Sequence, residues 1–293
     1  MVRGAALDPI GTAGMYDGYL LVEWPQPWPR DPGEIEQLAL LHEALCSTRV
    51  RLQIVVPRDG AQDRRLILYR HPSDGGFAGF HRAERVVPPY DVVEAAVALL
   101  DGGGAVDAGA RVDGDVLVCT HGRRDVCCGS RGTALALELL RSPPWSTDAT
   151  RVWRTSHTGG HRFAPTAVVL PSGTVWAFVD ADLLCRVVRR EGPLDDLLPR
   201  YRGCAGVGPG PVQAVEREAF AEVGWQWLDW RRSGTINADG TASVIGTSPG
   251  GETQTWTAEV EIERMVMVPE CGQSVEAAKN LEPELRVRNL SRS

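Results

Sequence analysis

Two cysteines and two histidines near the middle of the chain have the residue types and spacing of a metal-ligand set. Eight residues separate Cys119 from Cys128, and His157 and His161 flank a Gly-Gly pair. Thiolate and imidazole together suit zinc, iron or copper. Because glycine has no Cβ, the backbone between the two histidines can turn tightly and leave room for an inorganic centre. The sequence therefore predicts a metal centre within residues 116–165.

The spacing narrows the choice of metal. Structural zinc sites usually combine Cys-x2–4-Cys with His-x3–5-His. The histidine pair fits that pattern, but the gap between Cys119 and Cys128 is long for a zinc knuckle and better matched to a larger centre. Cys127 directly precedes Cys128, so either thiol is available beside Cys119. A zinc-stabilised binding module without a redox role remains the alternative.

The pattern Cys-x8-Cys followed by His-x-Gly-Gly-His resembles the sucrase/ferredoxin-like family. The core of the resemblance covers residues 114–205, and looser similarity extends from Gly11 to Glu218. It implies an α/β protein whose second part is a thioredoxin-like ferredoxin domain. Because Cys128 directly precedes Gly129, as the family's second cysteine precedes a glycine, the resemblance favours Cys128 over Cys127.

The resemblance further implies a [2Fe–2S] cluster bound by Cys119, Cys128, His157 and His161. The expected function is one-electron transfer between donor and acceptor proteins that the sequence does not identify. Two neutral ligands in place of two thiolates raise the potential above that of an all-cysteine cluster. Each ligating imidazole keeps a second ring nitrogen that can carry a proton, so electron transfer is expected to be coupled to a proton.

Three further polar residues are candidates for orienting these ligands through hydrogen bonds. They are His121, Asp125 and Arg162, which lie within or beside the cysteine and histidine motifs.

The pattern of apolar runs predicts two α/β halves in tandem. The first half is predicted as β-α-β-β-α, with strands at 19–24, 50–56 and 66–69, a helix from Asp31 to Leu45, and a second helix at 92–100. The second half is predicted to have strands at 115–119, 151–154, 166–170 and 175–179 and helices at 132–140 and 181–190. The 97-residue spacing from Tyr19 to Val116 is consistent with two tandem thioredoxin-like units, of which only the second carries ligands.

The last ninety residues change character. Pro211 opens a predicted helix, and strands are expected at 242–246, 255–263 and 265–268, separated by turn sequences. This gives three predicted domains, namely 1–104 without cluster ligands, 105–205 with the ferredoxin site, and 206–293 with a helix and a small antiparallel sheet.

Composition limits the other possible functions. The net charge of −7 argues against a nucleic-acid-binding surface, and no segment approaches the ~20 apolar residues of a membrane span. Seven cysteines are an odd number for a disulfide framework, and no signal peptide is evident, so a cytoplasmic location is expected. The sequence gives no indication of the oligomeric state.

Three other chemistries fit the sequence less well. Cys119 and His121 are close enough for a nucleophile pair, but residues two apart on a strand commonly share a face without forming a catalytic dyad. Dithiol exchange needs Cys-x-x-Cys, whereas Cys127 and Cys128 are adjacent. Sugar hydrolysis needs a placed pair of carboxylates, and none stands out. An electron carrier is therefore expected rather than a hydrolase.

Overall fold

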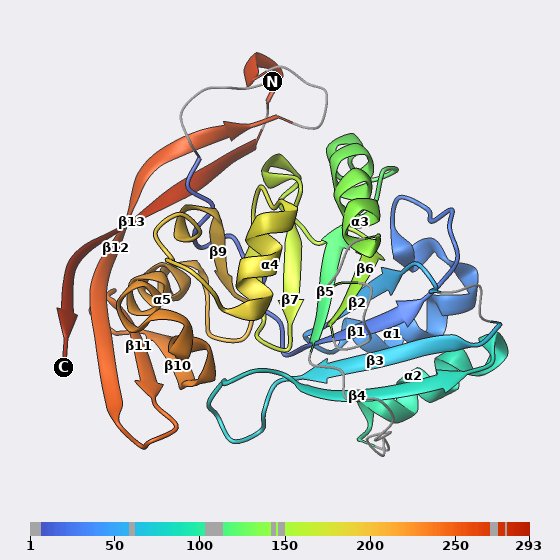
Figure 1. Ribbon diagram of the computed structural model, residues 1–293, viewed down its shortest axis with the longest axis horizontal. Helices are drawn as coiled ribbons and strands as arrows, with labels where there is room; N and C mark the ends of the chain where they lie inside the picture. The colour runs from blue at the N-terminus through green and yellow to red at the C-terminus, as the bar shows by residue number, and fades with distance from the viewer. Residues whose placement is uncertain are drawn as a thin grey trace.

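The computed structural model describes residues 7–58, 62–102, 114–141, 145, 150–269, 275–278 and 280–293. It is a mixed α/β structure with one large mixed sheet and a separate antiparallel sheet (Figure 1). The large sheet contains β1 (Gly18–Glu23), β2 (Val50–Val55), β3 (Arg64–Arg70), β4 (His81–Val87), β5 (Gly114–Cys119), β6 (Thr150–Thr155), β7 (Ala167–Leu170), β8 (Thr174–Trp176) and β9 (Tyr201–Cys204). The helices are α1 (Ala39–Cys46), α2 (Val92–Leu100), α3 (Thr133–Leu140), α4 (Ala181–Arg189) and α5 (Gly210–Val223).

The large sheet repeats one arrangement of strands. Its order is β4-β3-β1-β2-β6-β5-β7-β8-β9. In each half the first and second strands are parallel, and the third is antiparallel to the first and to the fourth. The halves meet where β2 and β6 run antiparallel, and the register there consists of the single pair Val55 and Thr155. Each half thus has the order β-α-β-β-β-α.

The first half departs from its predicted order by one strand. Strand β4 was not predicted, because its sequence His-Arg-Ala-Glu-Arg-Val-Val is mostly charged and lacks a clean apolar alternation. The predicted helix from Asp31 also begins later than expected. Asp31 caps a short 3-10 turn (Pro32–Glu34), a second turn (Glu36–Leu38) follows, and regular helix starts only at Ala39.

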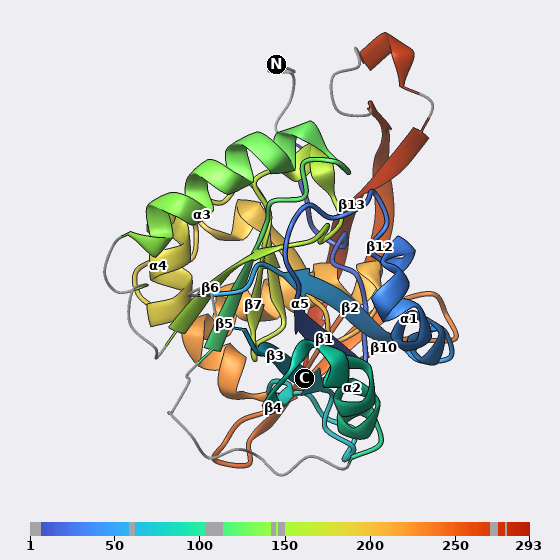
Figure 2. The ribbon, with the colours of Figure 1, turned by 90° about the vertical axis from the view of Figure 1, so that its right-hand side faces the viewer.

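The central strands are buried on both faces, as their apolar sequences require. Every residue of β1 and of β5 is buried. On β1, Leu20 and Val22 face a core formed with α1 and α2, whereas Tyr19 and Leu21 face a larger core shared with β5. Helices α3 and α4 cover the second half of the sheet (Figure 2). Cys119 is the last residue of β5.

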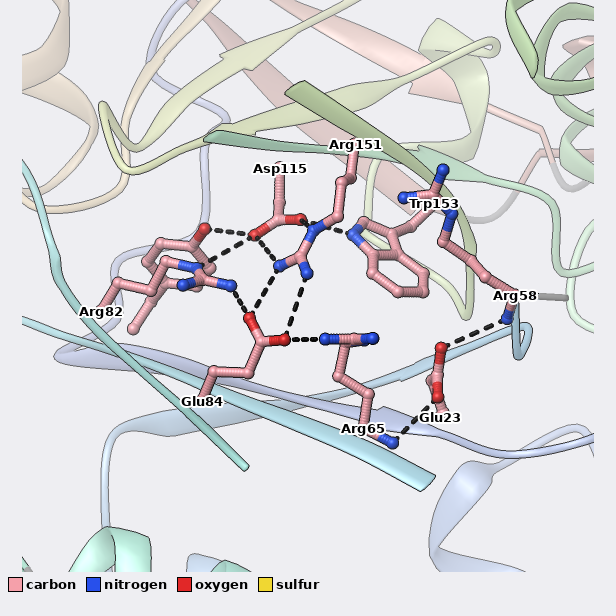
Figure 3. Close-up of polar contacts among 9 residues, drawn as sticks. Glu23, Arg58, Arg65, Arg82, Glu84, Asp115, Arg151 and Trp153 are labelled. Carbon is pink, nitrogen blue, oxygen red and sulfur yellow. Dashed lines mark hydrogen bonds and ion pairs between the residues drawn. The ribbon is translucent and has the colours of Figure 1, made fainter. Parts of the chain in front are cut away.

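Buried ion pairs tie the two halves together across the larger core (Figure 3). Asp115 of β5 is fully buried and accepts hydrogen bonds from Arg151 Nε at 2.8 Å, from Trp153 Nε1 at 2.6 Å and from the Tyr69 hydroxyl. Arg151 also donates to both oxygens of Glu84 on β4, at 3.2 and 3.1 Å. This network adds to the hydrogen bonds between the β2 and β6 segments, such as the one from the amide of Ser156 to the carbonyl oxygen of Ile54 at 2.8 Å.

The second sheet is antiparallel, as predicted, and has the order β10-β11-β12-β13. Its strands are β10 (Arg231–Ile236), β11 (Ala242–Thr247), β12 (Thr253–Val268) and β13 (Asn280–Arg292). The two predicted strands 255–263 and 265–268 are one continuous strand, which crosses an irregularity in its pairing with β13 between Ile262 and Arg264. Strand β13 was not predicted, since Pro283 within it cannot donate to a ladder.

Strands β12 and β13 form a long ribbon that runs along the side of the molecule and extends past the end of the large sheet (Figures 1 and 2). Nearer the body, α5 connects this sheet to the larger core, in which Trp256 of β12 and Phe220 of α5 are fully buried. The predicted domain boundary at residues 104 and 105 falls outside the described residues, and the three-domain division remains a prediction. Among the described residues, no helix is long and apolar enough to cross a membrane.

Candidate metal centre

Three of the four expected ligands meet at the end of β5. Cys119 is its last residue, Cys128 begins the helical segment that leads into α3, and His157 follows β6. One ligand atom from each of the three lies within 4.8 Å of the other two. Both thiols are buried, at 0 and 1% exposure, and Ala164 packs against them. The group is therefore a compact donor set whose two thiols are shielded from solvent.

A close approach of loop and helix brings the two cysteines together. Residues Cys128–Gly132 form a π-helical turn, a feature that often marks functional sites. A Cβ on Gly132 would lie 1.9 Å from the carbonyl oxygen of Cys119, and one on Gly129 would lie 2.4 Å from the Cα of Gly122. Any side chain at these two positions would push the helix away from β5. The glycines thus allow the short distance between the thiols.

The electrostatics favour a thiolate at Cys119. A hydrogen bond from Cys128 is the largest influence that holds the pKa of Cys119 well below its usual value, and burial opposes it. His157 and the backbone amides of His121 and Thr158 lower it further. A metal binds the thiolate and not the thiol, so this environment prepares Cys119 as a ligand.

Asp125 lies against both imidazoles. Its Oδ2 is 2.9 Å from Nδ1 of His157, and its Oδ1 is 3.7 Å from Nδ1 of His161. The shorter contact is an ion pair, and neither of its two atoms has a hydrogen-bond partner among the described residues. Burial alone would lower the pKa of His157, but Asp125 and Cys119 outweigh it and raise that pKa. Burial would likewise raise the pKa of Asp125, yet contact with His157 and the charge of His161 lower it.

His161 lies next to this group, but unlike His157 it is not among the residues whose ligand atoms converge within 4.8 Å. It begins a 3-10 turn (His161–Phe163), and its Nε2 lies 3.3 Å from the carbonyl oxygen of Pro269, which follows β12. Its side chain is 26% exposed, against 19% for His157. His161 therefore lies at the more open edge of the site, next to the C-terminal ribbon.

The doubled cysteine has two different environments. Cys128 belongs to the group with Cys119 and His157, whereas Cys127 is half-buried and packs against that group from outside. A helix separates successive side chains by about 100°, so adjacent residues cannot both face the end of β5.

The other two expected supporting residues make contacts of their own. His121 is buried beside Trp28, and its Nε2 lies 2.8 Å from the carbonyl oxygen of Pro29. Burial is the largest cause of its lowered pKa. Arg162 forms an ion pair with Glu282 of β13 and lies over the ring of Phe163. Of the three expected supports, only Asp125 has an ion-pair contact with the expected ligands.

The histidine loop is held by residues that sequence reasoning missed. Arg51 and Gln53 of β2 donate to the carbonyl oxygen of His157, at 2.6 and 3.3 Å. Arg202 of β9 donates to the carbonyl oxygen of Gly159 at 3.0 Å and to that of Thr12 at 2.6 Å. No local sequence signal marks these residues, because each contacts a segment far away in the chain.

Burial of Arg202 has an electrostatic cost. It lowers the pKa of the guanidinium to about 10, mainly through desolvation. The compensating hydrogen bonds go to backbone carbonyls and to Thr12 Oγ1, so Arg202 acts as a structural brace for the loop.

Comparison with known proteins identifies the family. A family model described as sucrase/ferredoxin-like matches residues 9–203, which is more than half of the chain and includes both cysteines and both histidines. No curated protein and no solved structure shows significant similarity. The match begins before β1 and ends in β9, so it spans the whole repeated sheet and leaves out α5 and the C-terminal sheet. The chain belongs to the sucrase/ferredoxin-like family.

Proposed function

We propose that this protein is an electron carrier that holds a [2Fe–2S] cluster on Cys119, Cys128, His157 and His161. The observation that carries the proposal is the convergence of two buried thiols and the His157 imidazole within 4.8 Å. Membership of a ferredoxin-like family supports it. When bound, such a cluster supplies one-electron oxidation and reduction.

The donor set fits this group chemically. Thiolates are the usual ligands of iron–sulfur clusters, and two imidazoles replace two of them in centres of higher potential. The lowered pKa of Cys119 favours its ligating form, and the burial of Cys128 excludes water from the sulfur side. Asp125 would orient the His157 ring through its ion-pair contact with Nδ1, which leaves Nε2 free to bind the metal.

Protons would enter at the histidines. With Nε2 of His157 committed to the metal, Nδ1 is the atom that would carry a proton, and it faces the carboxylate of Asp125 at 2.9 Å. Donor and acceptor proteins would approach the more exposed His161 edge. We further propose a cytoplasmic setting, which agrees with the unpaired state of the six cysteines that the structure describes.

The repeated strand order also supports a finer statement about fold. We infer that the two halves are diverged copies of one thioredoxin-like unit, because they share strand order, strand sense and helix positions. The first copy carries no thiol at the position of Cys119; its equivalent strand end is Glu23. It would then act as a scaffold, through Arg51 and Gln53.

The same 4.8 Å convergence favours a second candidate, a zinc-stabilised module. Zinc binds sulfur at about 2.3 Å and nitrogen at about 2.0 Å, so donors on one ion lie within about 4 Å of one another. The ligand atoms of Cys119, Cys128 and His157 lie within 4.8 Å of one another, so a small adjustment would bring them to this spacing. A [2Fe–2S] cluster would instead divide its four ligands between two iron ions.

Colour and metal content decide between the two. We expect protein purified under anaerobic, reducing conditions to be reddish-brown, with two irons and two acid-labile sulfides per chain. A colourless protein with one zinc and no sulfide would overturn the electron-carrier proposal and support the zinc module. Protein that holds neither metal, even after supply of iron and sulfide or of zinc, would overturn both.

A further inference from the structure

The C-terminal ribbon touches the candidate centre at two points. We call the C-terminal arm the residues from Ile262 to Pro269 together with Asn280 to Leu285. The carbonyl oxygen of Pro269 lies 3.3 Å from Nε2 of His161, and Glu282 forms an ion pair with Arg162. The arm lies outside residues 9–203, the part of the chain that matches the family.

The partner of Nε2 fixes which nitrogen of His161 carries hydrogen. A backbone carbonyl has no proton to donate, so Nε2 must be the donor in this contact. In the neutral ring, Nδ1 then keeps its lone pair. Its distance of 3.7 Å from Asp125 Oδ1 is too long for a hydrogen bond. Nδ1 of His161 is therefore the nitrogen available to a metal.

In His157 the other ring nitrogen is available to a metal. Its Nδ1 faces Asp125 at 2.9 Å, so its Nε2 is the available nitrogen. Metal-ligating histidines generally donate their other ring N–H to a carboxylate or a backbone carbonyl, which fixes the tautomer and the ring orientation. Here the Asp125 carboxylate makes an ion-pair contact with Nδ1 of His157, and the carbonyl oxygen of Pro269 in the arm accepts a hydrogen bond from Nε2 of His161.

We propose that the C-terminal arm is part of the metal centre. The carbonyl of Pro269 orients His161 so that this histidine ligates through Nδ1. Glu282 is a positioning residue that holds the arm in place through its ion pair with Arg162. The inference rests on the ligand set of the proposed function, in either its iron–sulfur or its zinc form.

The ion pair is suited to hold the arm. The side chain of Arg162 is 13% exposed and lies 4.1 Å from the centre of the Phe163 ring, so its guanidinium is largely removed from water. Burial lowers the pKa of Arg162, and Glu282 opposes that effect. Removing the carboxylate would leave a half-buried cation without its partner, which favours withdrawal of Arg162 and release of the arm. Val268, next to Pro269, is buried and anchors the same stretch.

The first experiment determines which ring nitrogens bind metal. Chelator-treated protein is loaded with Zn²⁺ under reducing conditions, and long-range ¹H–¹⁵N correlation spectra of the imidazoles are recorded. We expect His157 to be bound through Nε2 and His161 through Nδ1, with Nε2 of His161 protonated. Ligation of His161 through Nε2, or no ligation by His161 in a chain that binds zinc, would overturn the proposal.

The second experiment measures the coupling between the arm and the metal. We expect Zn²⁺ to slow amide exchange in residues 264–268, 280–282 and 284. Glu282→Gln should weaken Zn²⁺ binding about 10-fold, because outer partners of metal ligands typically contribute 10–100-fold in affinity. The matched control is Glu263→Gln on the same arm, whose exposed ion pair with Arg286 lies outside the contact with Arg162; its affinity should stay within about twofold.

The outcomes separate the two proposals. Unchanged or faster exchange in the arm on zinc loading, or equal affinities for Glu282→Gln and Glu263→Gln, would overturn the role of the arm while leaving Cys119, Cys128 and His157 as ligands. Failure of the wild-type chain to bind Zn²⁺ and also to assemble a cluster when iron and sulfide are supplied would overturn the ligand set itself, and the role of the arm with it.

Discussion

Arg51 of β2 donates a hydrogen bond of 2.6 Å to the carbonyl oxygen of His157, which lies 106 residues later in the chain. The contact joins the first half of the sheet, which holds none of the expected ligands, to the loop that carries both histidines. Arg51 also lies over the ring of Tyr16 and donates to its hydroxyl, so the guanidinium is held from two sides. The first half thus helps to determine where the second half presents its imidazoles.

Arg51→Met should weaken metal binding while the chain remains folded. Loss of the donor frees the His157 carbonyl, and we expect metal affinity to fall about 10-fold, as for other outer supports of metal ligands. Titration with Zn²⁺ measures the change, and thermal unfolding of the metal-free protein checks the fold. The control is Arg49→Met, which removes an exposed ion pair with Asp17 and an exposed hydrogen bond to the carbonyl oxygen of Met15. Equal affinities in the two variants would contradict a supporting role for Arg51.

Cysteine substitutions should divide into two classes. Cys119→Ser or Cys128→Ser should abolish or severely weaken metal binding, because each removes a buried thiol of the convergent group. Cys46→Ser and Cys185→Ser should leave the visible spectrum and the metal content unchanged. The same expectation holds for Cys271→Ser, although Cys271 lies outside the described residues. Loss of metal in Cys127→Ser but not in Cys128→Ser would show that the wrong member of the pair was chosen.

Replacing either histidine by cysteine should lower the midpoint potential of an assembled cluster. His157→Cys or His161→Cys adds a thiolate in place of a neutral imidazole, and the extra negative charge disfavours reduction. Voltammetry of the purified variants measures the shift. A potential that is unchanged in both variants, with iron and sulfide still bound, would mean that neither histidine touches iron.

Asp115→Asn should destabilise the whole protein. The carboxylate is fully buried and pairs with Arg151, so its neutralisation leaves buried cations undercompensated (Figure 3). Breaking a buried pair in this way typically costs about 3–5 kcal/mol. Urea unfolding of the metal-free chain measures the loss. Asp17→Asn, which removes an exposed pair with Arg49, should cost less than about 1 kcal/mol; similar values for both variants would refute the importance of the network.

Asp180 should stabilise the folded protein, and this stabilisation should be lost at acidic pH. It caps α4 by accepting from the amide of Leu183 at 2.8 Å, and Arg200 donates to it at 2.7 Å. Burial would raise the pKa of Asp180, but these two donors lower it overall. Its contribution is therefore complete above the ordinary Asp value of about 3.9 and is lost as the pH falls below that value through the lowered pKa.

The matching variant is Asp180→Ala, which should cost about 1 kcal/mol at pH 7, as expected for loss of an N-cap. The difference in unfolding free energy from the wild type should shrink in buffers below about pH 4, where the wild-type carboxylate also becomes protonated. A difference that stays constant from pH 7 to pH 2 would exclude the charged cap.

The sequence alone was sufficient for the strands and helices that combine buried, apolar runs with clear turns. Strands β1, β5 and β7 and helices α2, α4 and α5 lie close to their predicted bounds, because their local composition and their burial agree. Strands β4, β9, β10 and β13 were missed. Strands β4 and β13 are rich in charged residues and are stabilised by the ion pairs and neighbouring strands they meet only in the folded chain. Strand β9 has only four residues, and β10 has the mostly polar sequence Arg-Arg-Ser-Gly-Thr-Ile without apolar alternation.

The sequence by itself also indicated the family and the candidate ligands, because the cysteine and histidine motifs each lie within a short segment whose spacing is visible. Only the tertiary structure decided what surrounds them. The histidine loop is contacted by three distant residues, namely Arg51 of β2, Arg202 of β9 and Pro269 at the end of β12. Cys128 rather than Cys127 faces Cys119 because of the close packing at Gly129 and Gly132. These contacts join residues far apart in the chain, and no local pattern encodes them, because they depend on how the sheet and the C-terminal ribbon fold back over the end of β5.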